Sequence, residues 1–173
     1  LEGSFKQLKV IKHNFQKFPS NIKVDSVTVS DTSSSLESLL NIVESSTSAQ
    51  IAVFSSLISS IEEVTQFLQT KGIQTTYIHS ELKLEQRAEN LLNFLNGSKR
   101  VLVGSDLIER GLELNVQHVI LFNVPEKLDS LLRRVGRTGR KDKPGRATLF
   151  LRKNQEYLIP LIKKNQAQLK KTR

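Results

Sequence analysis

The chain has 173 residues, 38% of which are hydrophobic, so it is long enough for one domain of ordinary size with a buried core. Its 26 Lys and Arg outnumber 17 Asp and Glu, and the net charge of +9 favours a polyanionic partner, either a nucleic acid or an anionic membrane surface. Cysteine is absent, which excludes disulfides and thiolate metal sites; the three histidines show no metal-ligand spacing, and no apolar run approaches the roughly 18 residues of a membrane span.

Hydrophobic periodicity predicts short strands that alternate with longer helices. Residues 1–23 mix basic and aromatic side chains without a sustained period, and we interpret them as a linker or N-terminal extension. The elements that follow, in chain order, are a strand at 26–30, a helix capped within 31–35 and running to about 44, a strand at 50–54, a helix at 60–71 ended by Gly72, a strand at 75–78, a helix at 84–96 followed by Gly97, a strand at 100–103, a helical turn near 107–110, a strand at 118–122, a helix at 129–137, a strand at 147–151 and a basic amphipathic helix from about 155. The helix at 84–96 is expected to bury an apolar face made of Leu84, Ala88, Leu91, Leu92 and Leu95.

This alternation predicts an α/β fold with three αβα layers, in which helices cover both faces of a mainly parallel central sheet. We expect the domain itself to span 24–152 and a basic C-terminal helix to occupy 153–173. Ligands of such sheets gather at the carboxyl ends of the strands. The chemically informative segments that fall there are 54–56, 79–80, 104–106 and the loop after 125.

Residues 133–140 read Arg-Arg-Val-Gly-Arg-Thr-Gly-Arg, with four arginines and two glycines in eight positions. Arginines this close repel one another unless an anion lies among them. Glycine lets backbone approach a ligand closely, and planar guanidinium groups match phosphate oxygens. A solvated basic loop is the alternative interpretation, but the spacing Gly-Arg-x-Gly-Arg favours a surface that binds a polyphosphate.

Ser105 and Asp106 stand where a strand becomes a helical turn, so they are either an N-cap or contacts to a nucleic-acid backbone or its 2′-hydroxyls. His79 follows a strand, and a lone histidine is more often structural than catalytic. Arg87 has the structural alternative of a surface ion pair with Glu85 or Glu89. The lysines and arginines after residue 151 form either a solvated helix face or a nonspecific phosphate contact.

Two motifs of nucleotide-binding proteins are absent. There is no G-x-x-x-x-G-K-[ST] loop and no Asp-Glu-Ala-Asp run that would hold magnesium. The chain therefore offers groups that bind phosphate but no nucleotide cradle of its own.

Residues 50–151 resemble the C-terminal RecA-like lobe of DEAD-box RNA helicases. The stretch 133–140 is similar to motif VI of that family, usually His-Arg-Ile-Gly-Arg-Thr-Gly-Arg, and 105–113 is similar to motif V, usually Thr-Asp-x-x-Ala-Arg-Gly-x-Asp. Residues 51–56 resemble motif IV, and the helix that bears Arg87 resembles motif IVa. The order and spacing of the motifs also agree.

The resemblance implies that ATP with Mg²⁺ is held mainly by an N-terminal lobe and that RNA lies across both lobes. Arg137 and Arg140 are then the catalytic arginines that reach the γ-phosphate, with Arg140 as the best finger candidate. Motifs V and VI imply nucleotide contacts from Arg110, Gly111, Glu113, Arg134 and Gly136. The RNA-binding residues that the resemblance implies are Ser55, Ser56, His79, Arg87, Ser105 and Asp106. No residue is assigned to a metal.

Five positions depart from the family's pattern. Arg133 replaces the motif VI His, Glu109 the motif V Ala, Glu113 the motif V Asp, Leu84 the motif IVa Gln and Leu57 the motif IV Thr. The leading hypothesis is the C-terminal lobe of an ATP-dependent RNA helicase that unwinds RNA or remodels ribonucleoproteins, inactive as this chain alone. The alternatives are an ATPase-impaired RNA-binding assembly factor and a lobe of a DNA helicase of the same superfamily. Divergence and basic charge favour a mitochondrial matrix protein of ribosome assembly over a nuclear or cytoplasmic one, and we expect a monomer without a membrane partner.

Overall fold

The computed structural model describes residues 18–105, 116–139 and 143–171. Within them, six strands form one sheet in the order β1-β6-β5-β2-β4-β3, and every pairing is parallel. The strands are β1 (Ile22–Thr28), β2 (Ile51–Phe54), β3 (Thr75–Ile78), β4 (Val101–Gly104), β5 (His118–Leu121) and β6 (Gly145–Leu151). The helices are α2 (Thr32–Ser45), α3 (Ile58–Thr70), α4 (Leu84–Leu95), α6 (Leu128–Val135) and α7 (Ile159–Lys171), the last preceded by the 3₁₀ helix η1 (Lys153–Leu158).

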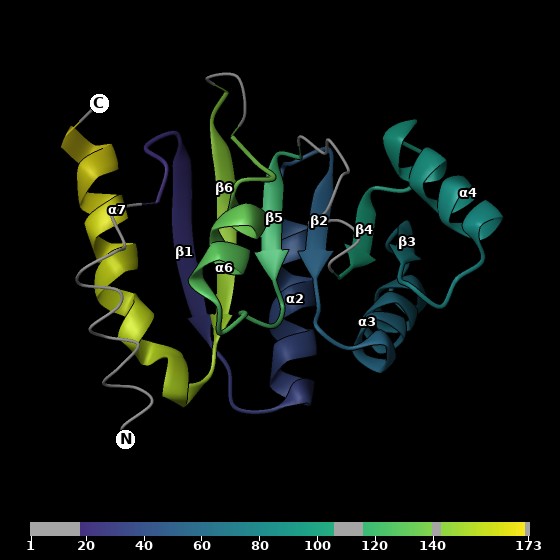
Figure 1. Ribbon diagram of the computed structural model, residues 1–173, viewed down its shortest axis with the longest axis horizontal. Coiled ribbons are helices and arrows are strands. Elements are labelled where there is room, and N and C mark those ends of the chain that lie inside the picture. Colours follow the sequence, from purple (N-terminus) through teal and green to yellow (C-terminus); the bar gives the residue numbers. More distant parts are fainter. Residues whose placement is uncertain (1–17, 106–115, 140–142, 172–173) are drawn as a thin grey trace.

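The sheet lies between two helical layers, as the alternating pleat of its strands requires. In β2, Ile51 and Val53 point to the cluster covered by α2 and α3, whereas Ala52 and Phe54 point to the cluster that includes residues of α4, α6 and α7. Figure 1 shows α6 in front of the sheet and α2 behind it. The predicted three-layer α/β fold is therefore confirmed.

The predicted elements agree with the observed ones to within a few residues, apart from the first strand and the last helix. β1 begins at Ile22, four residues before the predicted strand, and the predicted C-terminal helix is divided into η1 and α7. The helical turn predicted near 107–110 lies outside the described residues. Asp31 caps α2, because its carboxylate accepts a hydrogen bond from Ser34 N at 2.7 Å, and this bond lowers the pKa of Asp31.

The predicted buried face of α4 is wrong. Leu84, Leu92 and Leu95 are 74%, 60% and 55% exposed, and Ala88 is exposed as well. The core-facing residues are Asn90 and Phe94, and Leu91 packs against the core only in part. Asn90 is turned inward because its Nδ2 donates to Tyr77 O at 2.8 Å, which satisfies a backbone carbonyl of the edge strand β3.

Candidate functional site

Ser55 and Ser56 follow β2 at the carboxyl edge of the sheet, and Asn123 holds both of them. The Ser55 hydroxyl lies 2.7 Å from Asn123 Oδ1, and Ser56 N donates to the same oxygen at 3.2 Å. Ser55 is fully buried and also lies 2.7 Å from the Ser60 hydroxyl, so its side chain is engaged inside the domain. Ser56 is exposed, so it is the member of this pair whose side chain is accessible from solvent.

Ser105 directly follows β4, beside this pair. Its neighbour Gly104 accepts a hydrogen bond from Ser55 N at 2.9 Å, which places the turns after β2 and β4 side by side. Ser105 is partly exposed. Asp106, which was expected to act with it, lies outside the described residues.

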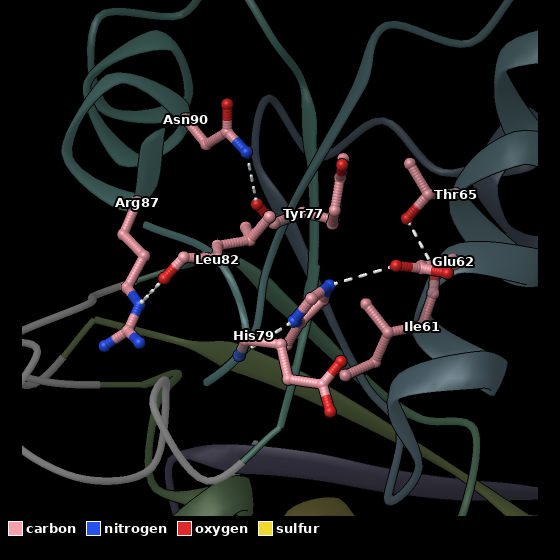
Figure 2. A network of polar contacts seen from close by, with 9 residues as sticks. Ile61, Glu62, Thr65, Tyr77, His79, Leu82, Arg87 and Asn90 are labelled. Carbon is pink, nitrogen blue, oxygen red and sulfur yellow. Dashed lines mark hydrogen bonds and ion pairs between the residues drawn. The ribbon is translucent and has the colours of Figure 1, made fainter. Parts of the chain in front are cut away.

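His79 directly follows β3, the strand beside β4, and its ring points into the protein. Figure 2 shows the imidazole directed toward α3, where Nε2 lies 3.3 Å from Glu62 Oε1. Its Nδ1 accepts from Glu81 N at 3.2 Å, and the side chain is buried. With both ring nitrogens used, His79 shapes the turn after β3 and leaves its backbone, not its ring, at the edge.

Arg87 lies in the first turn of α4, and its guanidinium binds the backbone of the turn that connects β3 to α4. Its Nε donates to Leu82 O at 2.9 Å (Figure 2). Its Nη2 donates to Ser80 O. Among the described residues, no ion pair joins Arg87 to Glu85 or Glu89. The surface ion pair that the sequence offered as an alternative role for Arg87 is therefore not formed, and its guanidinium bonds backbone carbonyls instead. Arg87 is partly exposed, so the guanidinium holds residues 80–82 while it faces the same edge as Ser56 and Ser105.

The loop that leaves α6 carries the Gly-Arg-Thr-Gly sequence, and the two residues before β5 fix its backbone. Arg137 O accepts from Val116 N at 3.0 Å, and Thr138 Oγ1 donates to Gln117 O at 3.0 Å. Asn21 Nδ2 donates to Gly139 O from before β1, 118 residues away in sequence. Two segments that are distant from each other along the chain therefore hold Arg137–Gly139, which we call the arginine loop.

Two glycines make this attachment sterically possible. Gly139 has φ +66°, which glycine adopts without strain, and a Cβ there would lie 2.6 Å from Ile22 Cγ1. A Cβ on Gly145, at the start of β6, would lie 2.4 Å from both Gly139 N and Thr138 Oγ1. The arginine loop therefore packs directly on the backbone of β6.

Arg134 lies earlier in α6 and is only 4% exposed. Its guanidinium carbon stacks on the Phe54 ring at 5.4 Å from the centroid. In this position Arg134 joins α6 to the end of β2, the strand that leads into Ser55. Its expected contact with a nucleotide stays a prediction. Gly136, the C-cap of α6, has φ −68° and connects Arg134 to the arginine loop.

His118 lies buried in β5 directly after Gln117. Its Nε2 is 2.8 Å from Thr148 Oγ1, and Nδ1 has no hydrogen-bond partner among the described residues. Burial lowers the pKa of His118 to about 4, and the positive charge of Arg146 adds to the lowering. The strand that supports the arginine loop is therefore built around a neutral imidazole.

The described site residues form two separate groups. Ser55, Ser56, His79 and Ser105 follow the carboxyl ends of β2, β3 and β4, and Arg87 joins them from α4. The arginine loop instead lies at the amino ends of β5 and β6, next to a hollow of about 670 Å³ that Gly139 and Lys143 help to line. α6 runs between the two groups. Five predicted site residues lie outside the described part of the chain: Asp106, Arg110, Gly111, Glu113 and Arg140.

Within the described ranges, no group of three or more His, Asp or Glu side chains is arranged to hold a metal ion. The same ranges contain no helix with the length and apolarity of a membrane span.

Known proteins share both the sequence and the fold. A family model described as the helicase conserved C-terminal domain matches residues 34–142, well over half of the chain. The chain belongs to this helicase C-terminal domain family. DEAD-box ATP-dependent RNA helicase 39 of Arabidopsis thaliana is 33% identical over 147 residues, which cover 83% of this chain and 24% of that protein.

Two solved structures show the same lobe. The C-terminal domain of the DEAD-box protein Dbp5 superposes with a TM-score of 0.74 at 21% identity, covering 84% of this chain and 85% of that one. S. cerevisiae Dbp5 bound to RNA and ADP BeF3 superposes with a TM-score of 0.77 at 21% identity, covering 88% of this chain and 41% of that one. The helicase lobe is thus of the RecA-like DEAD-box type, as expected, and it spans about a quarter of the length of the first curated relatives that it matches.

Sequence reasoning missed the residues that position the site. Asn123 follows an apolar strand at the carboxyl edge, so the rule that selected Ser55 and Ser105 would also have selected it. Phe54 lies in the segment 54–56 that the sequence singled out, but its contact with Arg134 could not be foreseen. The roles of Asn21 and Gly145 around the arginine loop likewise carry no signal in the sequence, because each acts through a partner that is distant along the chain.

Proposed function

We propose that this lobe is half of an ATP-dependent RNA helicase and that it contributes arginines to an ATP site completed by an N-terminal RecA-like lobe. Arg137 and Arg140 have the role of stabilising charge on the γ-phosphoryl group. Mg²⁺ and most of the nucleotide would be held by the N-terminal lobe. The observation that carries the proposal is the attachment of the Arg137–Gly139 backbone to the residues before β5, to β6 and to Asn21, because an arginine carried on a fixed backbone needs less reorganisation to stabilise a transition state.

We assign RNA to the carboxyl edge. Ser56 and Ser105 offer hydroxyls there, and Arg87 brings a positive charge to the same edge. Contacts of this kind bind phosphate and sugar without reading the bases. The RNA in the Dbp5 complex and the names of the curated relatives support RNA over DNA as the ligand.

α6 connects the two groups physically. Arg134 contacts Phe54 at the end of β2, and Arg137 follows three residues later in the arginine loop. A shift of Ser55 and Ser56 on RNA binding therefore has a direct packed route to the arginines. This supports the enzyme over a clamp that binds RNA without hydrolysis.

The test joins the chain to its N-terminal lobe and measures RNA-stimulated ATP hydrolysis for Arg137→Ala and Arg140→Ala. An arginine finger contributes about 10³–10⁵ to kcat, so each variant is expected to lose at least a hundredfold. Arg152→Ala, an exposed arginine at the start of η1, is the matched control and is expected to keep the wild-type rate. A loss below tenfold for both loop variants would overturn the finger assignment.

A comparison of RNA with DNA of the same sequence tests the ligand, because only RNA has the 2′-hydroxyl. Equal stimulation by both would favour the DNA-helicase alternative. Binding of RNA with no hydrolysis in the joined protein would favour the assembly factor. The mitochondrial location stays a prediction, which imaging of the tagged protein tests. The role in ribosome assembly also stays a prediction.

A further inference from the structure

The outward side of α4 carries an apolar stripe that the domain does not use. Leu84, Ala88, Leu92 and Leu95 are all exposed, and the three leucines are 55–74% exposed. At 100° per residue these four positions fall within an arc of about 80°, and they extend along about 16 Å of helix. Large apolar side chains gathered on one exposed face are typical of an interaction surface.

The stripe cannot be buried against the domain by turning α4. α4 is attached to the sheet through its opposite side, where Asn90 Nδ2 donates to Tyr77 O at 2.8 Å and Phe94 is fully buried. Figure 1 shows α4 at the β3 end of the sheet, with no other described element beyond it. Rotating α4 to bury the stripe would remove both attachments, so the exposure is a property of the fold.

Charge beside the stripe selects the kind of partner. Glu85 and Glu89, one turn apart, border it along one side, and both are exposed. Neither forms an ion pair with any residue that the structure describes. In a chain of net charge +9, this is an acidic border on an apolar surface. Phosphate is repelled by such a border, and Arg87 lies at the other end and on the other side of the stripe, so RNA is a poor occupant of the surface around Leu92 and Leu95.

A second copy of the chain is also a poor match. When two such helices pack antiparallel about a twofold axis through the middle of the stripe, the same border of each faces the other, and Glu89 would lie close to its equivalent. Like charges in that arrangement oppose association.

We propose that the α4 stripe is a docking site for an amphipathic helix of a partner protein, whose apolar face carries a basic border. Leucines of such a helix would pack on Leu84, Leu92 and Leu95, and its lysines or arginines would face Glu85 and Glu89. The stripe begins at Leu84, close to Arg87 of the carboxyl edge, but Leu92 and Leu95 lie toward the other end of α4. The proposal does not depend on the proposed function.

The test uses two synthetic helical peptides of about 18 residues, identical except that one has lysines and the other glutamates along the border. The 173-residue chain is titrated with each, and amide shifts are followed by NMR. We expect the basic peptide to perturb α4 and to bind about tenfold more tightly than the acidic one. Reversing the border with Glu85→Lys plus Glu89→Lys is expected to exchange the two preferences, and Leu92→Ser is expected to abolish both.

All of these side chains are exposed, so folding is expected to survive, and circular dichroism checks it. Equal binding of the two peptides, or shifts that avoid α4, would overturn the proposal. Concentration-dependent dimerisation of the free chain that Leu92→Ser removes would assign the stripe to a second copy instead. Protection of the Leu92 and Leu95 amides by RNA alone would assign the stripe to nucleic acid, because these residues lie about one to two turns beyond Arg87.

Discussion

Replacing Gly145 by alanine tests whether the arginine loop depends on close backbone packing. The added Cβ would lie 2.4 Å from Gly139 N and from Thr138 Oγ1, whereas ordinary van der Waals contact begins at 3.4 Å. Either the loop or the start of β6 must then move by about 1 Å, because 3.4 minus 2.4 leaves that gap. Gly145 itself does not have a positive φ, so alanine adds steric overlap without backbone strain.

The expected cost has two parts. Overpacking of this kind destabilises a domain by about 1–3 kcal/mol, which urea unfolding of the chain measures. A displacement of about 1 Å at a catalytic group lowers the rate by about a hundredfold, which the RNA-stimulated ATPase of the joined two-lobe protein measures. Affinity for RNA is expected to stay unchanged, because the carboxyl edge lies at the other end of the strands.

Gly97→Ala is the matched control. Gly97 has φ +85°, and a Cβ there would meet no atom within 4 Å, so alanine adds strain of about 1–2 kcal/mol without touching the loop. The control should lose stability and keep its ATPase rate. If Gly145→Ala also retains ATPase within twofold of wild type, the reasoning about the packed loop is refuted.

Three further outcomes follow from the same structure. The pKa of His118 is about 4 in the folded chain against the usual 6.5, so between these values the unfolded chain binds a proton that the folded chain does not. The free energy of unfolding therefore falls by up to about 3 kcal/mol as pH is lowered through that window. Urea unfolding of His118→Gln should show a flatter pH dependence than wild type, and equal slopes would contradict this prediction. Asn165→Ala should cost about 2–4 kcal/mol of unfolding free energy, because buried Val24 N and Ile22 O each lose a bond of 3.0 Å, and a cost below 1 kcal/mol would show that water replaces the amide. Four lysines of α7 are exposed: Lys163, Lys164, Lys170 and Lys171. Changing them to glutamine should keep the stability and should reduce the slope of log binding constant for single-stranded RNA against log salt by about 0.7 for each phosphate that is no longer neutralised. An unchanged slope would leave α7 with a structural role only.

Local chemistry made much of the fold predictable. The strand at Thr75–Ile78 was predicted with its observed bounds, because it is a short apolar and β-branched run between turn signals. The cap of α2 followed from Asp31 and the serines after it, which bond backbone N–H groups within one turn. Polar residues placed directly after apolar strands likewise came to one edge, because parallel strands all end on the same side.

The support of the arginine loop could not be predicted in this way. Asn21 donates to Gly139 across 118 residues, and Gly145 matters only because Thr138 and Gly139 pack against it. Neither contact leaves a periodicity or a spacing in the sequence. The contact between Arg134 and Phe54 was equally unpredictable, because in the sequence Arg134 looks like an ordinary basic residue and Phe54 like an ordinary core residue.

The wrong prediction of the buried face of α4 has a physical cause, and the same cause acts on α7. Both helices lie at the edges of the sheet, α4 beside β3 and α7 beside β1, where strand backbone has no further strand to bond. Asn90 donates to Tyr77 O, and Asn165 bonds both Val24 N and Ile22 O, so an amide on the inner side of each helix replaces part of a missing strand. Such a helix must turn a polar residue inward. In α4, where few apolar side chains accompany Asn90, the side richest in leucine is left facing outward.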